Sequence, residues 1–179
     1  VQVPGGRAIV TRRYTGSGWD WGWLSHPTQV VVKSVVPVVV GQEATNAAEV
    51  EVEVLGISHR GQGSVDSLNG VHSGVFYSSA GDRLSREPSG WLWRPVAGDT
   101  LRYDGEGRLR SMTGQEGASL HFGYDASSNR IDRVLEHGSN QVFWIDYNAR
   151  GLPAEIRDAA TGGRRVAYRY DPAGNLTNV

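Results

Sequence analysis

The chain has 179 residues, of which 39 % are hydrophobic and 21 % charged, and its formal net charge is -1. This composition is typical of globular proteins and excludes the poorly hydrophobic, highly charged chains that stay disordered. Binding to nucleic-acid phosphates requires a concentrated basic surface, whereas the 18 basic residues here are mixed among 19 acidic ones. We therefore expect no nucleic-acid partner.

The residue content favours short strands joined by many turns. Glycine accounts for 24 of the 179 residues, a fraction well above its usual share of about 7 %, and six tryptophans and seven tyrosines are present. Apolar and polar residues alternate along most of the chain, and no window of about a dozen residues shows a helical apolar stripe. We predict an all-β fold. Because cysteine is absent, neither disulfides nor thiolate metal sites can stabilise it.

No stretch approaches the roughly 18 to 20 apolar residues of a membrane-spanning helix, so we expect no membrane insertion. The N-terminus shows no basic region followed by an apolar one, so no signal peptide is visible. The first residue is not methionine, which indicates a mature or truncated fragment.

A group of aromatic residues lies near the N-terminus, where Trp19, Trp21 and Trp23 occupy alternate positions. In an extended strand this spacing places all three indoles on one face. We favour packing as core, because large aromatic side chains usually contribute buried area. The alternative is an exposed row that stacks on sugar rings, which would make the chain a carbohydrate or cell-surface binding module. Trp91 and Trp93 leave the same two interpretations open.

Residues 1–99 are predicted to form a β-rich N-terminal domain. The valine-rich stretch of residues 30–40 is interrupted by a lysine, a serine and a proline, and we predict two strands there. Residues 42–48 are predicted to be a polar loop or a short helical turn, since Glu, Ala and Asn cluster there without apolar spacing. In residues 49–54, glutamate and valine alternate, which predicts a half-buried strand with the valines on one face.

Residues 100–179 form a second predicted domain, because a tyrosine followed by Asp or Asn recurs there four times. The intervals are 21, 23 and 23 residues, and self-similarity at such a period indicates stacked supersecondary units. The pairs are Tyr103-Asp104, Tyr124-Asp125, Tyr147-Asn148 and Tyr170-Asp171. Each tyrosine ends an alternating strand, on its apolar face, and apolar residues resume a few positions later. We predict that each unit is one β-hairpin.

The chemistry of a tight turn follows each of these tyrosines. The Asp or Asn side chain can accept hydrogen bonds from N–H groups two or three positions on, and a glycine at the fourth position can adopt the positive φ that reverses the chain. In the second repeat the loop is one residue longer and offers an asparagine in place of glycine. The predicted turn residues are Tyr103, Asp104, Gly107, Tyr124, Asp125, Asn129, Tyr147, Asn148, Gly151, Tyr170, Asp171 and Gly174.

These motifs resemble the repeat of the Rhs, or YD-repeat, family, in which Tyr-Asp precedes a glycine and then an apolar pair. The similar segments are YDGEGRLRSM, YDASSNRIDRV, YNARGLPAEI and YDPAGNLTNV. The upstream part is similar, more loosely, to the segment that opens an Rhs core, through Thr11, Arg12, Tyr14, Gly22 and Trp23.

The resemblance implies antiparallel hairpin repeats that form a curved, spiralling sheet, part of an Rhs/YD shell. Such a shell encloses or presents a toxin or cargo domain, as in bacterial polymorphic toxins that are secreted or delivered to the cell exterior. It also implies that the partners are the remaining core segments or another chain along an open sheet edge, including a second copy of this one. Four repeats cannot close a shell alone.

The sequence offers no pattern that signals catalysis or a metal. The histidines lack the short spacings that place two imidazoles on one metal: they are His26, His59, His72, His121 and His137. Neither a phosphate-binding glycine loop nor a nucleophile elbow is present. The alternating glutamates of residues 49–53 are more simply a solvated strand face than a calcium or acid/base cluster. We predict no enzyme activity, no metal site and no cofactor.

Overall fold

Every regular element that the structure describes is a β-strand. The structure is a computed structural model, and it describes residues 13–14, 19–20, 29–40, 43–54, 57–68, 71–114, 117–137, 141–159 and 165–179. The strands pair in antiparallel order, which confirms the predicted all-β class built from hairpins. Within those residues, no helix is long and apolar enough to cross a membrane.

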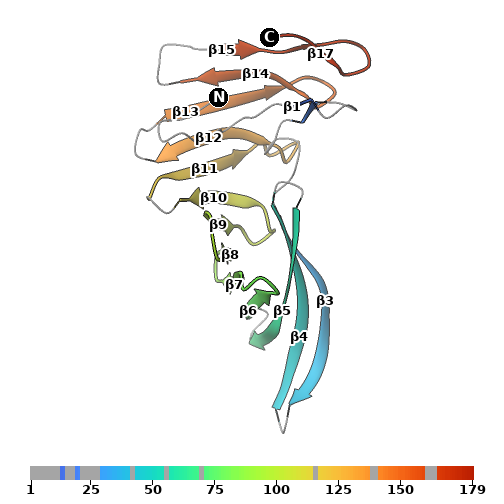
Figure 1. The fold of residues 1–179 in the computed structure, drawn as a ribbon, viewed down its shortest axis with the longest axis vertical. Coiled ribbons are helices and arrows are strands. Elements are labelled where there is room, and N and C mark those ends of the chain that lie inside the picture. The colour runs from blue at the N-terminus through green and yellow to red at the C-terminus, as the bar shows by residue number, and fades with distance from the viewer. Residues whose placement is uncertain are drawn as a thin grey trace. The chain divides into compact units, whose positions relative to one another are not determined.

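The chain divides into two compact units, residues 27–117 and residues 1–26 with 118–179. In the first unit, eight strands follow one another as antiparallel neighbours, from the blue β3 to the yellow-green β10 in Figure 1. They are β3 (Gln29–Val40), β4 (Glu43–Val54), β5 (Ile57–Leu68), β6 (Val71–Ser78), β7 (Arg83–Glu87), β8 (Gly90–Arg94), β9 (Thr100–Tyr103) and β10 (Leu109–Thr113). The first Tyr-Asp hairpin, β9–β10, thus belongs to this unit.

Two predictions for the start of this unit are wrong. The valine-rich stretch forms one strand, β3, because a register shift between Val32 and Ser34 accommodates Lys33 as an extra residue. Pro37 is tolerated because β3 is the last strand in the order of its sheet, where a missing N–H need not break a ladder. Residues 43–48, predicted as loop or helical turn, belong to β4, which pairs with β3 on one side and β5 on the other.

The core of this unit is a row of residues that runs straight across the strands. Each member lies opposite the next in the antiparallel register: Gly63, Phe76, Leu84, Trp93, Leu101 and Met112. From Phe76 to Met112 all are buried. Gly63 leaves room for its neighbours, since a Cβ there would overlap the carbonyl oxygen of Val75 and touch the Phe76 ring. In β4, Val50 and Val52 are also buried, as the alternation predicts.

The first strand of this unit returns to its last hairpin. The N–H of Val30 donates to the carbonyl oxygen of Gly107 at 2.9 Å, and Gln29 forms an antiparallel bridge with Arg108. Since β3 and β10 are at opposite ends of the strand order of this unit, its sheet curls to bring them together.

The second unit contains five antiparallel strands in sequence order and two short hairpins. The five are β11 (Ser119–Tyr124), β12 (Ile131–His137), β13 (Gln141–Tyr147), β14 (Pro153–Asp158) and β15 (Arg165–Ala167). The hairpins are formed by β1 (Arg13–Tyr14) with β2 (Trp19–Asp20) and by β16 (Arg169–Tyr170) with β17 (Leu176–Asn178). One face of the five strands carries the buried side chains Leu120, Phe122, Val134, Phe143, Ile145 and Ile156.

We predict that Gly63→Ala destabilises the protein by about 1 to 3 kcal/mol, because the added methyl group forces strand β6 to move. Urea denaturation followed by tryptophan fluorescence measures the effect. Gly105→Ala is the matched control, since the nearest atom to its new Cβ is Arg86 Nη2 at 3.9 Å. Equal midpoints for both variants would contradict the packing described for this row.

Candidate functional site: the repeat turns

The twelve predicted turn residues lie in four equivalent hairpins, β9–β10, β11–β12, β13–β14 and β16–β17. In each, the N–H of the Asp or Asn donates, at 2.9 Å, to the carbonyl oxygen of the residue that follows the turn. The donor and acceptor pairs are Asp104 and Arg108, Asp125 and Arg130, Asn148 and Leu152, and Asp171 and Asn175. The structure therefore gives the four Tyr-Asp positions the same main-chain role.

The residue that ends each turn has a positive φ. Gly107, Gly151 and Gly174 have φ values of 84°, 78° and 93°, and the N–H of each donates to the carbonyl oxygen of the Asx residue three positions earlier. In the second turn, Asn129 has a φ of 55° and donates to Asp125, four positions earlier. Asparagine enters this left-handed region more readily than most residues, and it closes the longer loop.

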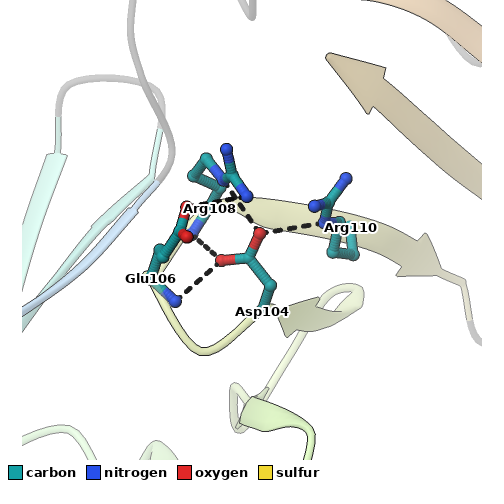
Figure 2. Close-up of polar contacts among 4 residues, drawn as sticks. All are labelled: Asp104, Glu106, Arg108 and Arg110. Carbon is teal, nitrogen blue, oxygen red and sulfur yellow. Dashed lines mark hydrogen bonds and ion pairs between the residues drawn. The ribbon is translucent and has the colours of Figure 1, made fainter. Parts of the chain in front are cut away.

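The first turn is held together by the Asp104 carboxylate, as Figure 2 shows. Its Oδ1 accepts from the main-chain N–H groups of Glu106 and Arg108, both at 3.0 Å. Its Oδ2 accepts from Nε of Arg108 at 2.8 Å and Nε of Arg110 at 2.9 Å. Burial alone would raise the pKa of Asp104, but these hydrogen bonds and the two arginine charges lower it below its ordinary value.

The other turns use the same acceptor with local variations. Asn148 Oδ1 accepts from the N–H groups of Arg150 and Leu152, so a neutral amide can replace the carboxylate. Asp171 accepts from both the main chain and the side-chain amide of Asn175, which lower the pKa of that carboxyl group. In the second turn, the Asp125 carboxylate accepts hydrogen bonds from two serine residues, and these bonds lower its pKa to about 2.

A β-bulge accompanies every one of these tyrosines, which the sequence did not predict. Tyr103, Tyr124, Tyr147 and Tyr170 lie opposite Leu109, Ile131, Pro153 and Leu176. The register then shifts by one residue, which leaves Arg110, Asp132, Ala154 and Thr177 as the extra residues. A bulge bends its strand and increases the local twist, so the same distortion recurs in each hairpin.

In the second unit, tyrosine hydroxyl groups join one hairpin to the one before it. Tyr147 donates from its hydroxyl group to the carbonyl oxygen of Ile131 at 2.7 Å, and Tyr170 donates to that of Pro153 at 2.6 Å. Since Ile131 lies opposite Tyr124 and Pro153 lies opposite Tyr147, each acceptor is the residue that faces the preceding tyrosine. Burial raises the pKa of Tyr147 above its ordinary value and that of Tyr170 to about 12, so both keep the proton they donate.

Arginines make a second set of contacts between successive turns, which the sequence analysis also missed. Arg150, in the third turn, donates from its two Nη atoms to the carbonyl oxygens of Asp171 and Pro172 in the fourth, each at 2.7 Å. The Arg130 guanidinium, beside the second turn, lies 5.5 Å from the centroid of the Tyr147 ring. Neither arginine could have been identified from the sequence as a contact between turns, because its partner lies in the next hairpin.

The tryptophan row predicted as a possible binding surface lies outside the side chains that the structure describes. Trp21 and Trp23 lie outside the described residues, and only the main chain of Trp19, in β2, is described. Trp91 and Trp93 are buried, at 8 % and 3 % exposure, and therefore pack as core.

One histidine lies beside an acidic side chain. His59 Nδ1 is 3.5 Å from Asp82 Oδ2, and Asp82 also accepts from the Ser78 hydroxyl group and the Val96 N–H.

Two further histidines lie close to each other. The rings of His121 and His137 lie across the β11–β12 hairpin with centroids 5.9 Å apart, a proximity that their sequence spacing does not predict. Among the described residues, no group of three His, Cys, Asp or Glu side chains could hold a metal ion.

A known family model matches the segment that contains the two C-terminal turns. Residues 147–179 match the model described as RHS Repeat, and this segment contains the third and fourth Tyr-Asx turns with the hydrogen bonds that join them. This segment is therefore similar to the RHS repeat family. The resemblance inferred from the Tyr-Asp motifs is thereby confirmed, and the RHS repeat is a structural repeat. No curated protein matches the chain.

The glycines of the first and fourth turns should differ in their tolerance of a side chain. At Gly174 a Cβ would meet nothing closer than Leu152 Cδ1 at 3.8 Å, so Gly174→Ala should cost only the roughly 1 to 2 kcal/mol of a left-handed backbone. At Gly107 the Cβ would also overlap the Val30 carbonyl oxygen, so Gly107→Ala should cost more. Thermal unfolding of both variants measures the difference, and a greater loss for Gly174→Ala would contradict it.

The hydroxyl group of Tyr147 should contribute to the stability of the RHS repeats. We predict that Tyr147→Phe destabilises the protein by about 1 to 2 kcal/mol, because the Ile131 carbonyl oxygen loses its donor. Tyr77→Phe is the matched control, since that side chain is 57 % exposed. Hydrogen exchange should show faster opening in β12 and β13 for Tyr147→Phe alone. Unchanged exchange there would show that the bond adds nothing.

The stability of the second turn should be sensitive to acid. Because the folded pKa of Asp125 is lowered to about 2, its charged form contributes stability above the ordinary pKa of about 3.9. This contribution is lost as the pH falls from about 4 through about 2. Asp125→Asn should therefore flatten the dependence of the unfolding midpoint on pH, with Asn148 showing that an amide supports such a turn. An identical pH dependence for both proteins would refute this role.

Proposed function

We propose that this chain is a non-catalytic structural segment of an RHS-repeat β-shell. The shell encloses or presents a toxin or cargo domain, in a protein that is secreted or delivered to the cell exterior on contact. The observation that carries the proposal is that the β11–β12 and β13–β14 hairpins each supply the acceptor for the tyrosine hydroxyl group of the next hairpin. An assembly with this rule can be extended by repetition, because every added hairpin presents the same acceptor again.

The C-terminal edge supports further extension. β15 is the last strand in the order of its sheet, and β17 pairs with β16 with Arg169 opposite Asn178. A strand that continues this register beyond Val179 runs antiparallel along β15. The partner is therefore the next segment of the shell or, in its place, another chain that pairs along the same edge, since uncovered strand edges recruit strands.

Blocking this edge tests the proposal. The N–H of Tyr168 donates to the Ala154 carbonyl oxygen, so the alternation of a strand directs the N–H of Ala167 away from β14. Ala167→Pro removes that outward donor and leaves the ladder to β14 intact. We expect the average mass from size-exclusion chromatography with light scattering to rise with concentration for the natural chain, and to rise much less for Ala167→Pro.

Ala149→Pro is the matched control, because the equivalent position of the fourth turn already holds Pro172. It should associate like the natural chain. A natural chain that stays monomeric at high concentration, or an Ala167→Pro variant that associates equally, would contradict an open edge on β15.

The reading frame beyond Val179 tests the shell itself. We expect further Tyr-Asp pairs at spacings similar to those of residues 103–170, followed by a domain of different composition. A frame that ends at Val179, or that continues without such pairs, would overturn the proposed role.

A further inference from the structure

The exposed face of the first unit carries two arginines directly opposite each other. Arg83 on β7 lies opposite Arg94 on β8, and the same row continues through Tyr77 on β6 to Gln62 on β5. All four residues are exposed. On each of these strands the row lies one position away from the core row described above, so its side chains point to the opposite face of the sheet.

The two positive charges of this pair are not compensated. In the part of the chain that the structure describes, no carboxylate pairs with the guanidinium of Arg83 or Arg94. The acid on the same face of β7, Glu87, is already bound by Arg102 Nη1 at 2.8 Å. Residues directly opposite on neighbouring strands have Cβ atoms about 4.5 to 5.5 Å apart, and like charges there destabilise a sheet. The arginine pair therefore lowers the stability of the fold and needs another explanation.

Exposed apolar surface lies beside these arginines. Tyr77 is 57 % exposed, and Val96, two positions after Arg94, is 71 % exposed. Val96 lies close to the turn before β7, since a Cβ on Gly81 would be 3.3 Å from Val96 Cγ2. Tyrosine and arginine are enriched among the residues that contribute most to binding between proteins. The patch formed by Tyr77, Arg83, Arg94 and Val96 thus has the composition of a protein-docking surface.

The charge of the patch selects an acidic partner. Guanidinium groups bind carboxylates in two-point contacts, and a carboxylate placed between Arg83 and Arg94 also removes their mutual repulsion. Nucleic acids require a larger concentration of basic residues than two arginines. The exposed apolar surface of Tyr77 and Val96 adds nothing to the binding of a purely polar polyanion, but it fits the apolar side chains of a polypeptide.

We propose that the exposed face of β6–β8 docks an acidic segment of a partner protein, with its carboxylates bound by Arg83 and Arg94 and its apolar side chains against Tyr77 and Val96. The surface goes beyond the structural role, because it lies on the first unit and depends neither on extension of the repeats nor on enclosure of a cargo. The stability that the arginine pair costs is regained when the partner binds.

Thermal unfolding of the full chain tests the repulsion. Arg94→Gln should raise the melting temperature by about 1 to 3 °C, because one of two facing charges is removed. Arg102→Gln is the matched control: this exposed arginine is already paired with Glu87, so its loss should not raise the melting temperature. A melting temperature that Arg94→Gln leaves unchanged or lowers would overturn the inference, because the pair would then be part of the fold's own support.

Fluorescence anisotropy at physiological salt tests the docking. The probe is a labelled hexapeptide of alternating glutamate and leucine, and the control peptide has glutamine in place of glutamate. We expect saturable binding of the acidic peptide alone. Arg83→Gln and Arg94→Gln should each weaken it about tenfold, the loss expected for one hydrogen-bonded charge pair, and Arg102→Gln should not.

Tyr77→Ala separates apolar contact from charge, and it should weaken binding of the acidic peptide without changing the net charge of the protein. No saturable binding, equal binding of the glutamine peptide, or binding that both arginine variants retain would overturn the proposal. Stronger binding of a heparin hexasaccharide than of the acidic peptide would also overturn it, because charge density alone would then govern recognition.

Discussion

Successive hairpins in the second unit are joined by hydrogen bonds from tyrosine hydroxyl groups to main-chain carbonyl oxygens. Each bond contributes only about 0.5 to 1.5 kcal/mol net, but a buried carbonyl that loses its donor costs more than that. The acceptors, Ile131 and Pro153, are offered at the β-bulges beside the preceding tyrosines, so a distorted bulge displaces the acceptor of the next hairpin. The Arg150 contacts couple neighbouring turns in the same direction. Order in one repeat therefore supports order in the next.

The turns could be predicted from the sequence because their chemistry is local. An Asx side chain and a residue tolerant of positive φ lie within five positions of each other, so spacing alone indicates Asp104 and Gly107 or Asp125 and Asn129. The β-bulges could not be predicted, since they depend on the register between two strands. For the same reason the targets of Arg150 and Tyr147 were missed: their partners lie 16 to 22 residues away in the chain.

Residues 43–48 show where local composition fails to predict the structure. Their polar composition favours a loop, yet β3 and β5 supply hydrogen-bonding partners on both sides and make them part of a strand. Tryptophan spacing is similarly limited as a guide to function. Alternation places Trp91 and Trp93 on one strand face, but only the fold reveals that this face is covered.

The bond between Val30 and Gly107 has a consequence for how the first unit reaches its native state. Neighbouring strands of the meander can pair as soon as each is synthesised, because their contacts span short loops. The Val30 contact closes a loop of 77 residues (107 minus 30), and closing a long loop carries an entropy cost that local pairing does not. The curl of this sheet should therefore be among the last events in folding. During translation it must wait until the first tyrosine-aspartate turn has left the ribosome.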